Sequence, residues 1–183
     1  MKARVKDEVL KSLSSAVVLL LIALTANAQR LTTTYDRFED RTTVNTPDQT
    51  VQSSNRPGEL LTITAFFTCP GRAGNVIDQF GLYLILTGRQ TSDITNTRLN
   101  ILLDGKRTVL ARATDREARF EDKITAEFLA FAIPLPLLKQ IAHAKKIEMR
   151  LGVSEFRLGD RLSSDVAVLL KQVSRLRKPH HFQ

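Results

Sequence analysis

Two apolar runs decide the fold of this chain, Leu61-Thr-Ile-Thr-Ala-Phe-Phe-Thr-Cys69 and Phe80-Gly-Leu-Tyr-Leu-Ile-Leu86. In the first run, apolar residues occupy every second position and threonines fill most of the others, which is the pattern of a strand with one buried face. The second run is apolar at odd and even positions alike, which predicts a central strand covered on both sides. The turn residues Pro70-Gly71 separate the two runs.

A β-hairpin is predicted after these runs. Two strand-like segments at residues 98–103 and 106–111 are joined by Asp104-Gly105. This dipeptide favours a two-residue type I′ turn, because both turn positions need a positive φ. The resulting register pairs Ile101 with Thr108 and Leu99 with Leu110.

The remaining periodic segments predict further strands and two helices. Alternating apolar residues predict strands over residues 127–133, 147–153 and 156–158. Residues 134–144 have the period of a short helix, with Pro136 in its first turn. A longer amphipathic helix is predicted over residues 161–176, with an apolar stripe made of Leu162, Val166, Leu169, Leu170, Val173 and Leu176.

These segments together predict an α+β domain. Its main element is an antiparallel β-sheet of about seven or eight strands, with a short helix and a C-terminal amphipathic helix. A two-layer, sandwich-like arrangement with helices closing one side is the alternative. The expected organisation is a signal peptide at 1–28, a polar strand and loop at 29–58, a core at 59–178 that forms one domain with 29–58, and a tail at 179–183.

The polar segment before the core contains a candidate interaction site. Residues 35–44 predict a strand, with Phe38 and Val44 as its inward anchors. The candidate residues are Arg37, Phe38, Glu39, Asp40 and Arg41. They are interpreted either as an interaction edge or as an edge strand whose alternating charges prevent edge-to-edge pairing. Residues 45–58 and 112–123 are expected to be a long loop and a solvated connection.

The first 28 residues have the three parts of a secretory signal. A leader with four basic residues precedes an uncharged apolar run of 11 residues, 16–26, and Ala26-Asn27-Ala28 then precedes Gln29. Small residues at Ala26 and Ala28 predict cleavage before Gln29, and hence a periplasmic or secreted protein. An uncleaved membrane anchor and a buried core helix are the two alternatives for this segment.

The charge of the chain favours anionic partners. The formal net charge is +8, and residues 29–183 retain +6 because the leader holds four of the 27 basic and two of the 19 acidic residues. An envelope protein or an anionic envelope component is therefore the expected partner. Nucleic acid is not expected, since the basic residues are scattered and the chain has no Trp. Contact with the membrane is expected only in transit, through the signal peptide.

No motif in the sequence carries a recognisable chemistry. Cys69 is the one cysteine, and it is expected to be buried. The three histidines, His143, His180 and His181, lack the spacing of a metal site. There is no Gly-x-Ser-x-Gly elbow and no phosphate-binding loop. The sequence therefore predicts no catalytic residue, no metal and no cofactor.

The stretch from residue 135 to 170 has a recognisable order of elements. It combines a helix, Ala144-Lys-Lys-Ile-Glu-Met-Arg-Leu-Gly152, Glu155-Phe-Arg-Leu158 and a second helix. It resembles the C-terminal half of small exported bacterial domains of unknown function, and this resemblance implies no activity, cofactor or site. We expect a non-enzymatic binding or structural module of the cell envelope. The alternatives are an exported hydrolase that uses Asp or Glu residues and a membrane-tethered accessory domain.

Overall fold

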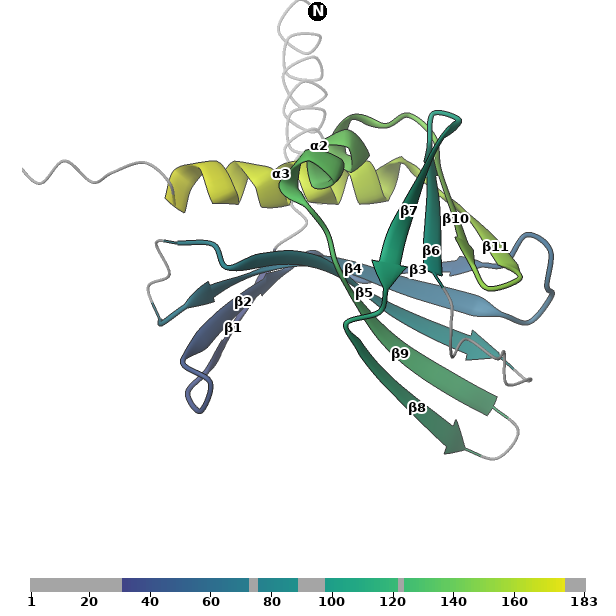
Figure 1. The fold of residues 1–183 in the computed structure, drawn as a ribbon, viewed down its shortest axis with the longest axis horizontal. Coiled ribbons are helices and arrows are strands. Elements are labelled where there is room, and N and C mark those ends of the chain that lie inside the picture. Colours follow the sequence, from purple (N-terminus) through teal and green to yellow (C-terminus); the bar gives the residue numbers. More distant parts are fainter. Residues whose placement is uncertain (1–30, 73–75, 89–97, 122–123, 177–183) are drawn as a thin grey trace, which may run out of the picture. The chain divides into compact units, whose positions relative to one another are not determined.

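The computed structural model describes residues 31–72, 76–88, 98–121 and 124–176. Within them, eleven strands form two antiparallel sheets beside two helices, which confirms the predicted α+β class (Figure 1). The strands are β1 (Thr32–Asp36), β2 (Arg41–Asn45), β3 (Gln49–Gln52), β4 (Leu60–Pro70), β5 (Gln79–Gly88), β6 (Arg98–Leu103), β7 (Lys106–Arg112), β8 (Asp115–Glu121), β9 (Ile124–Ala132), β10 (Ile147–Leu151) and β11 (Ser154–Leu158). The helices are α2 (Leu135–His143) and α3 (Asp160–Leu176).

Strand β4 organises the larger, seven-stranded sheet. It is 11 residues long and pairs with β5 over residues 60–68. Its other edge is shared, because β2 pairs with residues 66–70 and β3 with residues 60–63. The order is β1-β2-β4-β5-β9-β8, with β3 beside β4, and the four-stranded sheet has the order β11-β10-β6-β7. In Figure 1 the helices and the four-stranded sheet lie on the same side of the seven-stranded sheet.

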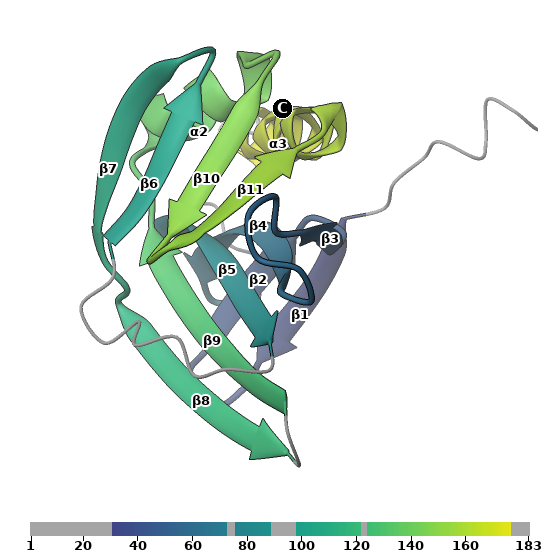
Figure 2. The same ribbon diagram turned by 90° about the vertical axis from the view of Figure 1, so that its right-hand side faces the viewer.

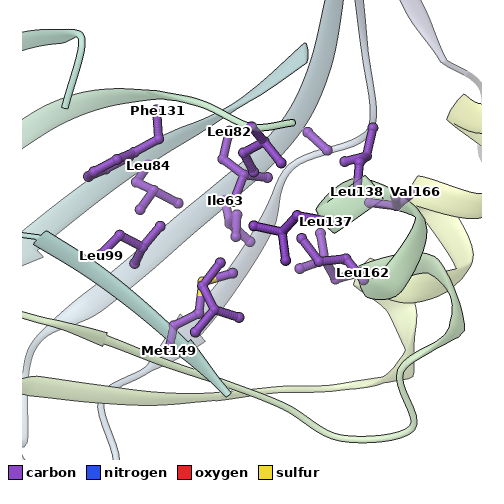
Figure 3. Packing of buried hydrophobic residues seen from close by; sticks show 14 of the residues in the cluster. Ile63, Leu82, Leu84, Leu99, Phe131, Leu137, Leu138, Met149, Leu162 and Val166 are labelled. Atoms are coloured by element: carbon purple, nitrogen blue, oxygen red, sulfur yellow. The ribbon is translucent and has the colours of Figure 1, made fainter. Parts of the chain in front are cut away.

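One hydrophobic cluster joins both sheets and both helices (Figure 3). Side chains with no exposed surface come from each layer: Ile63 and Leu82 from the seven-stranded sheet, Leu99 and Ile101 from the four-stranded sheet, Leu138 from α2 and Val166 from α3. Burial of a side chain of this size contributes about 1.5–3 kcal/mol. The predicted apolar stripe of α3 therefore faces the core. No helix in the described residues is long and apolar enough to cross a membrane.

The hairpin of β6 and β7 has the predicted turn. Asp104 and Gly105 have φ values of 50° and 82°, as a type I′ turn requires. Ile101 pairs with Thr108 as expected, whereas Leu99 has no single partner, and Leu110, its predicted partner, is one of two residues opposite it. The register shifts between residues 98 and 100, which places two residues of β7 opposite Leu99 and forms a bulge.

The N-terminal segment is a hairpin and not the single predicted strand. The Oδ1 atom of Asp36 accepts the backbone N–H groups of Phe38 and Glu39, at 2.8 and 3.2 Å, and so turns the chain between β1 and β2. This turn makes the prediction for Phe38 wrong, because its side chain is 85% exposed at the hairpin tip. The prediction for Val44 is confirmed, since Val44 is buried.

Two segments expected to be irregular contain strands. The predicted loop at 45–58 holds β3, and the predicted connection at 112–123 holds β8, which pairs with β9 from Asp115 to Glu121. Together with the division of residues 35–44, these strands raise the number above the seven or eight expected. They are polar edge strands that are held by backbone hydrogen bonds, so they lack the apolar alternation that reveals a strand in a sequence.

Polar contacts join the 53–59 segment to the hairpin of β10 and β11. Ser53 forms an isolated bridge with Phe156, and Asn55 bonds the carbonyl of Val153 and the N–H of Glu155 at 2.8 and 2.9 Å. The buried carboxylate of Glu59 accepts the Ser154 hydroxyl and lies 3.3 Å from the Arg56 guanidinium. Because a buried charge is costly unless it is paired, these bonds fix how the two sheets meet at this seam.

A second polar contact holds α3 against β3. The side-chain amide of Gln49 donates to Asp165 at 3.2 Å, and the Arg161 guanidinium lies 3.9 Å from the same carboxylate. Asp165 is buried in the face of α3 that packs on the core. Burial raises the pKa of Asp165, and the contacts with Gln49 and Arg161 offset only part of that rise.

We expect Val44→Ala to lower the stability of the protein and Phe38→Ala to leave it almost unchanged. Val44→Ala removes two buried methyl groups and should lower the free energy of unfolding by about 2 kcal/mol. Phe38→Ala truncates an exposed tip and should change it by less than about 0.5 kcal/mol. Urea denaturation followed by circular dichroism measures both. Equal losses for the two variants would contradict the hairpin.

Asp165 should make the free energy of unfolding of the protein depend on pH. Its folded-state pKa is raised, so the stability that it contributes is complete below the unfolded-state pKa of about 3.9 and is lost as the pH rises through the folded-state value. Asp165→Asn keeps an acceptor for Gln49 but cannot ionise. The free energy of unfolding of this variant, relative to the wild type, should therefore increase as the pH rises above about 4. Denaturation curves across this pH range test the sign, and a difference that falls with pH would refute it.

Candidate functional site

A groove of about 490 Å³ lies on the face of the seven-stranded sheet opposite the core. Its walls carry hydroxyl, amide, carboxyl and aromatic groups, which come from Thr32, Asn45, Asp48, Thr64, Tyr83 and Phe128. The strand pleat produces this arrangement: Leu82 and Leu84 point to the core, so Tyr83 between them points to the groove. The prediction that β5 is covered on both faces is therefore wrong.

The ring of Tyr83 forms a fixed platform in the groove. It is 43% exposed and stacks on Phe66, with ring centroids 4.1 Å apart and planes inclined by 15°. Phe66 lies opposite Gly81 in the register. A Cβ atom at Gly81 would lie 2.8 Å from the carbonyl oxygen of Phe131 and closer still to the Phe66 ring. The absence of a side chain at Gly81 thus lets Phe66 lie flat across β5 and support Tyr83 from beneath.

Polar groups stand beside this ring face. The hydroxyl of Thr64, which lies opposite Tyr83 in the register, donates to the Asp48 carboxylate. The Oδ1 atom of Asn45 is buried and has no hydrogen-bond partner among the described residues. An unpaired buried acceptor costs about 1–3 kcal/mol, so a donor that reached it would stabilise the groove. Asp48, between β2 and β3, and Thr64, on β4, therefore offer polar groups next to an aromatic surface.

The opposite wall is formed by β9, which contributes Phe128 and Leu129 to the lining. The Arg119 guanidinium lies 5.1 Å from the centroid of the Phe128 ring and 2.8 Å from a carboxylate oxygen of Glu117. The hydrogen bond from Arg119 holds the pKa of Glu117 below its ordinary value. Glu117 and Phe128 are cross-strand neighbours, so this charged pair lies on β8, beside the strand that lines the groove and outside the lining itself.

The five residues predicted as an interaction edge lie in and beside the tip of the first hairpin. Arg37, Phe38, Glu39 and Asp40 form its turn, and Arg41 begins β2. The Arg37 guanidinium lies over the Phe38 ring at 4.7 Å, and Arg41 lies 3.4 Å from Asp78. A hydrogen bond of 2.7 Å from the Tyr35 hydroxyl to Asp40 raises the pKa of Tyr35. The turn is thus internally ordered, and its role in binding stays a prediction.

Of the other residues singled out in the sequence, the structure describes Cys69 and His143. Cys69 is buried as predicted, and burial raises the pKa of its thiol, which disfavours the nucleophilic thiolate. His143 is exposed at the end of α2, where its Nδ1 atom lies 2.7 Å from the carbonyl oxygen of Lys139. His180, His181 and the predicted cleavage residues Ala26, Ala28 and Gln29 lie outside the described residues.

The function of the groove has to be inferred from the chemistry of its own residues. No group of three or more His, Cys, Asp or Glu side chains in the described part of the chain is placed to hold a metal ion. Comparisons with protein-family models, with curated proteins and with solved structures find no match to the chain.

Sequence reasoning missed the groove because it searched for local motifs. The available signal was the second row of β4, in which Thr62, Thr64 and Phe66 alternate with the apolar positions. A mixed hydroxyl and aromatic row on the exposed face of a strand is a candidate recognition surface. Its partners on β2, β5 and β9 come from distant parts of the chain, so they could be assigned only once the strand order was known.

Proposed function

We propose that this chain is an exported, non-enzymatic binding module of the bacterial cell envelope, and that its groove holds a sugar unit of an envelope glycan. The observation that carries this proposal is the half-exposed Tyr83 ring, stacked on Phe66 at 4.1 Å within a groove that combines apolar with polar side chains. The leader at residues 1–28 supports the export, as its sequence has the order of a signal peptide.

The groove matches the two-sided chemistry of a sugar. The C–H face of a pyranose is apolar and can cover an aromatic ring, which presents a large rigid apolar area. The hydroxyl groups at the edge of the sugar can donate to Asp48 and exchange hydrogen bonds with Thr64. A pocket with an apolar floor and a few placed polar groups is the usual form of a small-ligand site.

The number of carboxylates in the groove favours binding of a sugar over its hydrolysis. Two-carboxylate glycoside hydrolysis needs a pair of Asp or Glu residues on either side of the scissile bond. Among the described residues that line the groove, Asp48 is the one carboxylate, and it accepts the hydroxyl of Thr64. We therefore assign the groove to recognition.

Replacement of the aromatic platform should weaken glycan binding without unfolding the protein. Tyr83→Ala removes the stacking surface and should weaken binding at least about tenfold, or about 1.4 kcal/mol, whereas Tyr83→Phe keeps the ring and should retain most of the affinity. Co-sedimentation with insoluble envelope glycan and calorimetry with its soluble fragments provide the measurements. Val168→Ala, at a half-exposed position on α3, is the control for truncation elsewhere. Equal binding by Tyr83→Ala and the wild type would refute the proposal.

Export predicts a defined mature N-terminus. Mass spectrometry of the protein recovered from its native compartment should find a chain that begins at Gln29, or at its cyclised form. Ala28→Phe places a large side chain where the peptidase requires a small one, and should leave the leader attached. Asn27→Phe alters the unconstrained position between the two alanines and should be processed normally. An intact Met1 in the wild-type protein would instead support the membrane-tethered alternative.

A further inference from the structure

We propose that the outer face of the four-stranded sheet is a docking surface for the anionic phospholipid headgroups of a membrane. This face is the side of β11-β10-β6-β7 that points away from the core, and in Figure 2 the four strands stand in front of the helices. It is separate from the groove of the proposed function and does not depend on it.

Arginine dominates the charge of this face. The inward positions of the strands, such as Leu99, Ile101 and Met149, are buried. The alternate positions carry five arginines and two glutamates: Arg98, Arg107, Arg112, Arg150, Arg157, Glu148 and Glu155. Four strands about 4.8 Å apart span about 15 Å, so these charges form a compact basic array.

The acidic residues of the face do not neutralise it. Glu148 lies 2.9 Å from Lys146 and 3.7 Å from Arg157. Lys146 already offsets the charge of Glu148, so Glu148 does not cancel the charge of Arg157. Arg150 lies opposite Glu155 in the register, yet Arg150 makes no side-chain hydrogen bond or ion pair with another described residue. Its guanidinium donors are thus available to an external acceptor.

Two further arrangements favour an anion on this face. Arg98 and Arg112 are direct cross-strand partners, and like charges in that position are destabilising unless an anion lies between them. Arg107 is already oriented, because its Nε and Nη2 atoms donate to Asn100 at 3.3 and 2.8 Å. The planar guanidinium fork of arginine matches the oxygens of a phosphate group.

A membrane surface fits this face better than a discrete anion does. The arginines come from all four strands instead of converging on one point. The hollow among them is a shallow groove of about 280 Å³, which includes Leu102. Val109, on the same face, is 43% exposed. Phosphate contacts from a two-dimensional array, with apolar side chains between them, suit the interfacial layer of a bilayer.

A fluorescent probe on this face tests the proposal in the full chain. Cys69 is buried, so Val109→Cys supplies an accessible thiol for a polarity-sensitive dye. With vesicles of phosphatidylglycerol and phosphatidylcholine, the dye should shift to the blue. Vesicles of phosphatidylcholine alone should leave it unchanged, and added salt should reverse the shift. Because the dye reports on Val109, membrane binding through the apolar leader does not produce the signal.

Variants that remove charges then test which residues of the outer face bind the vesicles. Each basic residue near an anionic surface contributes about fivefold in partitioning, so Arg112→Gln with Arg150→Gln should raise the vesicle concentration at half-maximal shift about 25-fold. The matched control, Lys139→Gln with Lys171→Gln, removes the same charge from exposed positions on α2 and α3 and should change it less than about twofold. A dye at Val168→Cys, on α3, should show no shift.

Three results would overturn the assignment. One is a dye at Val109 that does not respond to anionic vesicles. Another is an equal loss of vesicle binding in the double arginine variant and the double lysine variant, which would reflect net charge alone. The third is binding of an anionic glycan fragment to this face in place of vesicles. Tyr83→Ala should leave the vesicle response intact, so failure here and failure of the proposed groove are separately observable.

Discussion

The structure depends on the burial of one face of β4 and β5 while the other face stays open. The odd-numbered residues of β4 and the leucines of β5 enter a single cluster with the four-stranded sheet and both helices. Because side chains in a strand alternate between faces, this burial forces Thr62, Thr64, Phe66 and Tyr83 to the opposite side. The same constraint therefore closes the core and creates the groove. A one-residue slip in register would exchange these two surfaces.

Close contacts between side chains fix the shape of the open face of the seven-stranded sheet. Gly81 allows Phe66 to lie across β5, and Phe66 in turn supports Tyr83. At the other edge of the core, Glu59, Ser154 and Asn55 fix the seam between the sheets. The seam therefore fixes the position of the four-stranded sheet, whose outer face carries the five arginines, relative to the core. Both surfaces proposed for binding are thus outer faces of strands whose inner faces are locked by packing.

The predictions that held concern segments with strong periodicity. The strands at 61–69 and 127–133, the Asp104-Gly105 turn and both helices appear as expected, because apolar spacing and turn chemistry act locally. The prediction for Phe38 is wrong because the apolar character of its side chain does not reveal the Asp36 turn that exposes it. The strands β3 and β8 were missed because they are polar and depend on β4 and β9 for their hydrogen bonds.

The sequence by itself determined the fold class, the inner row of each central strand and the amphipathic stripe of α3. These follow from hydrophobic periodicity, which one segment displays alone. Only the tertiary structure decided which strands are neighbours, and so which outer side chains share a surface. Tyr83, Asn45 and Phe128 meet through the order β2-β4-β5-β9, and the five arginines meet through β11-β10-β6-β7. Strand order arises from the joint burial of distant segments, and no local pattern in the chain encodes it.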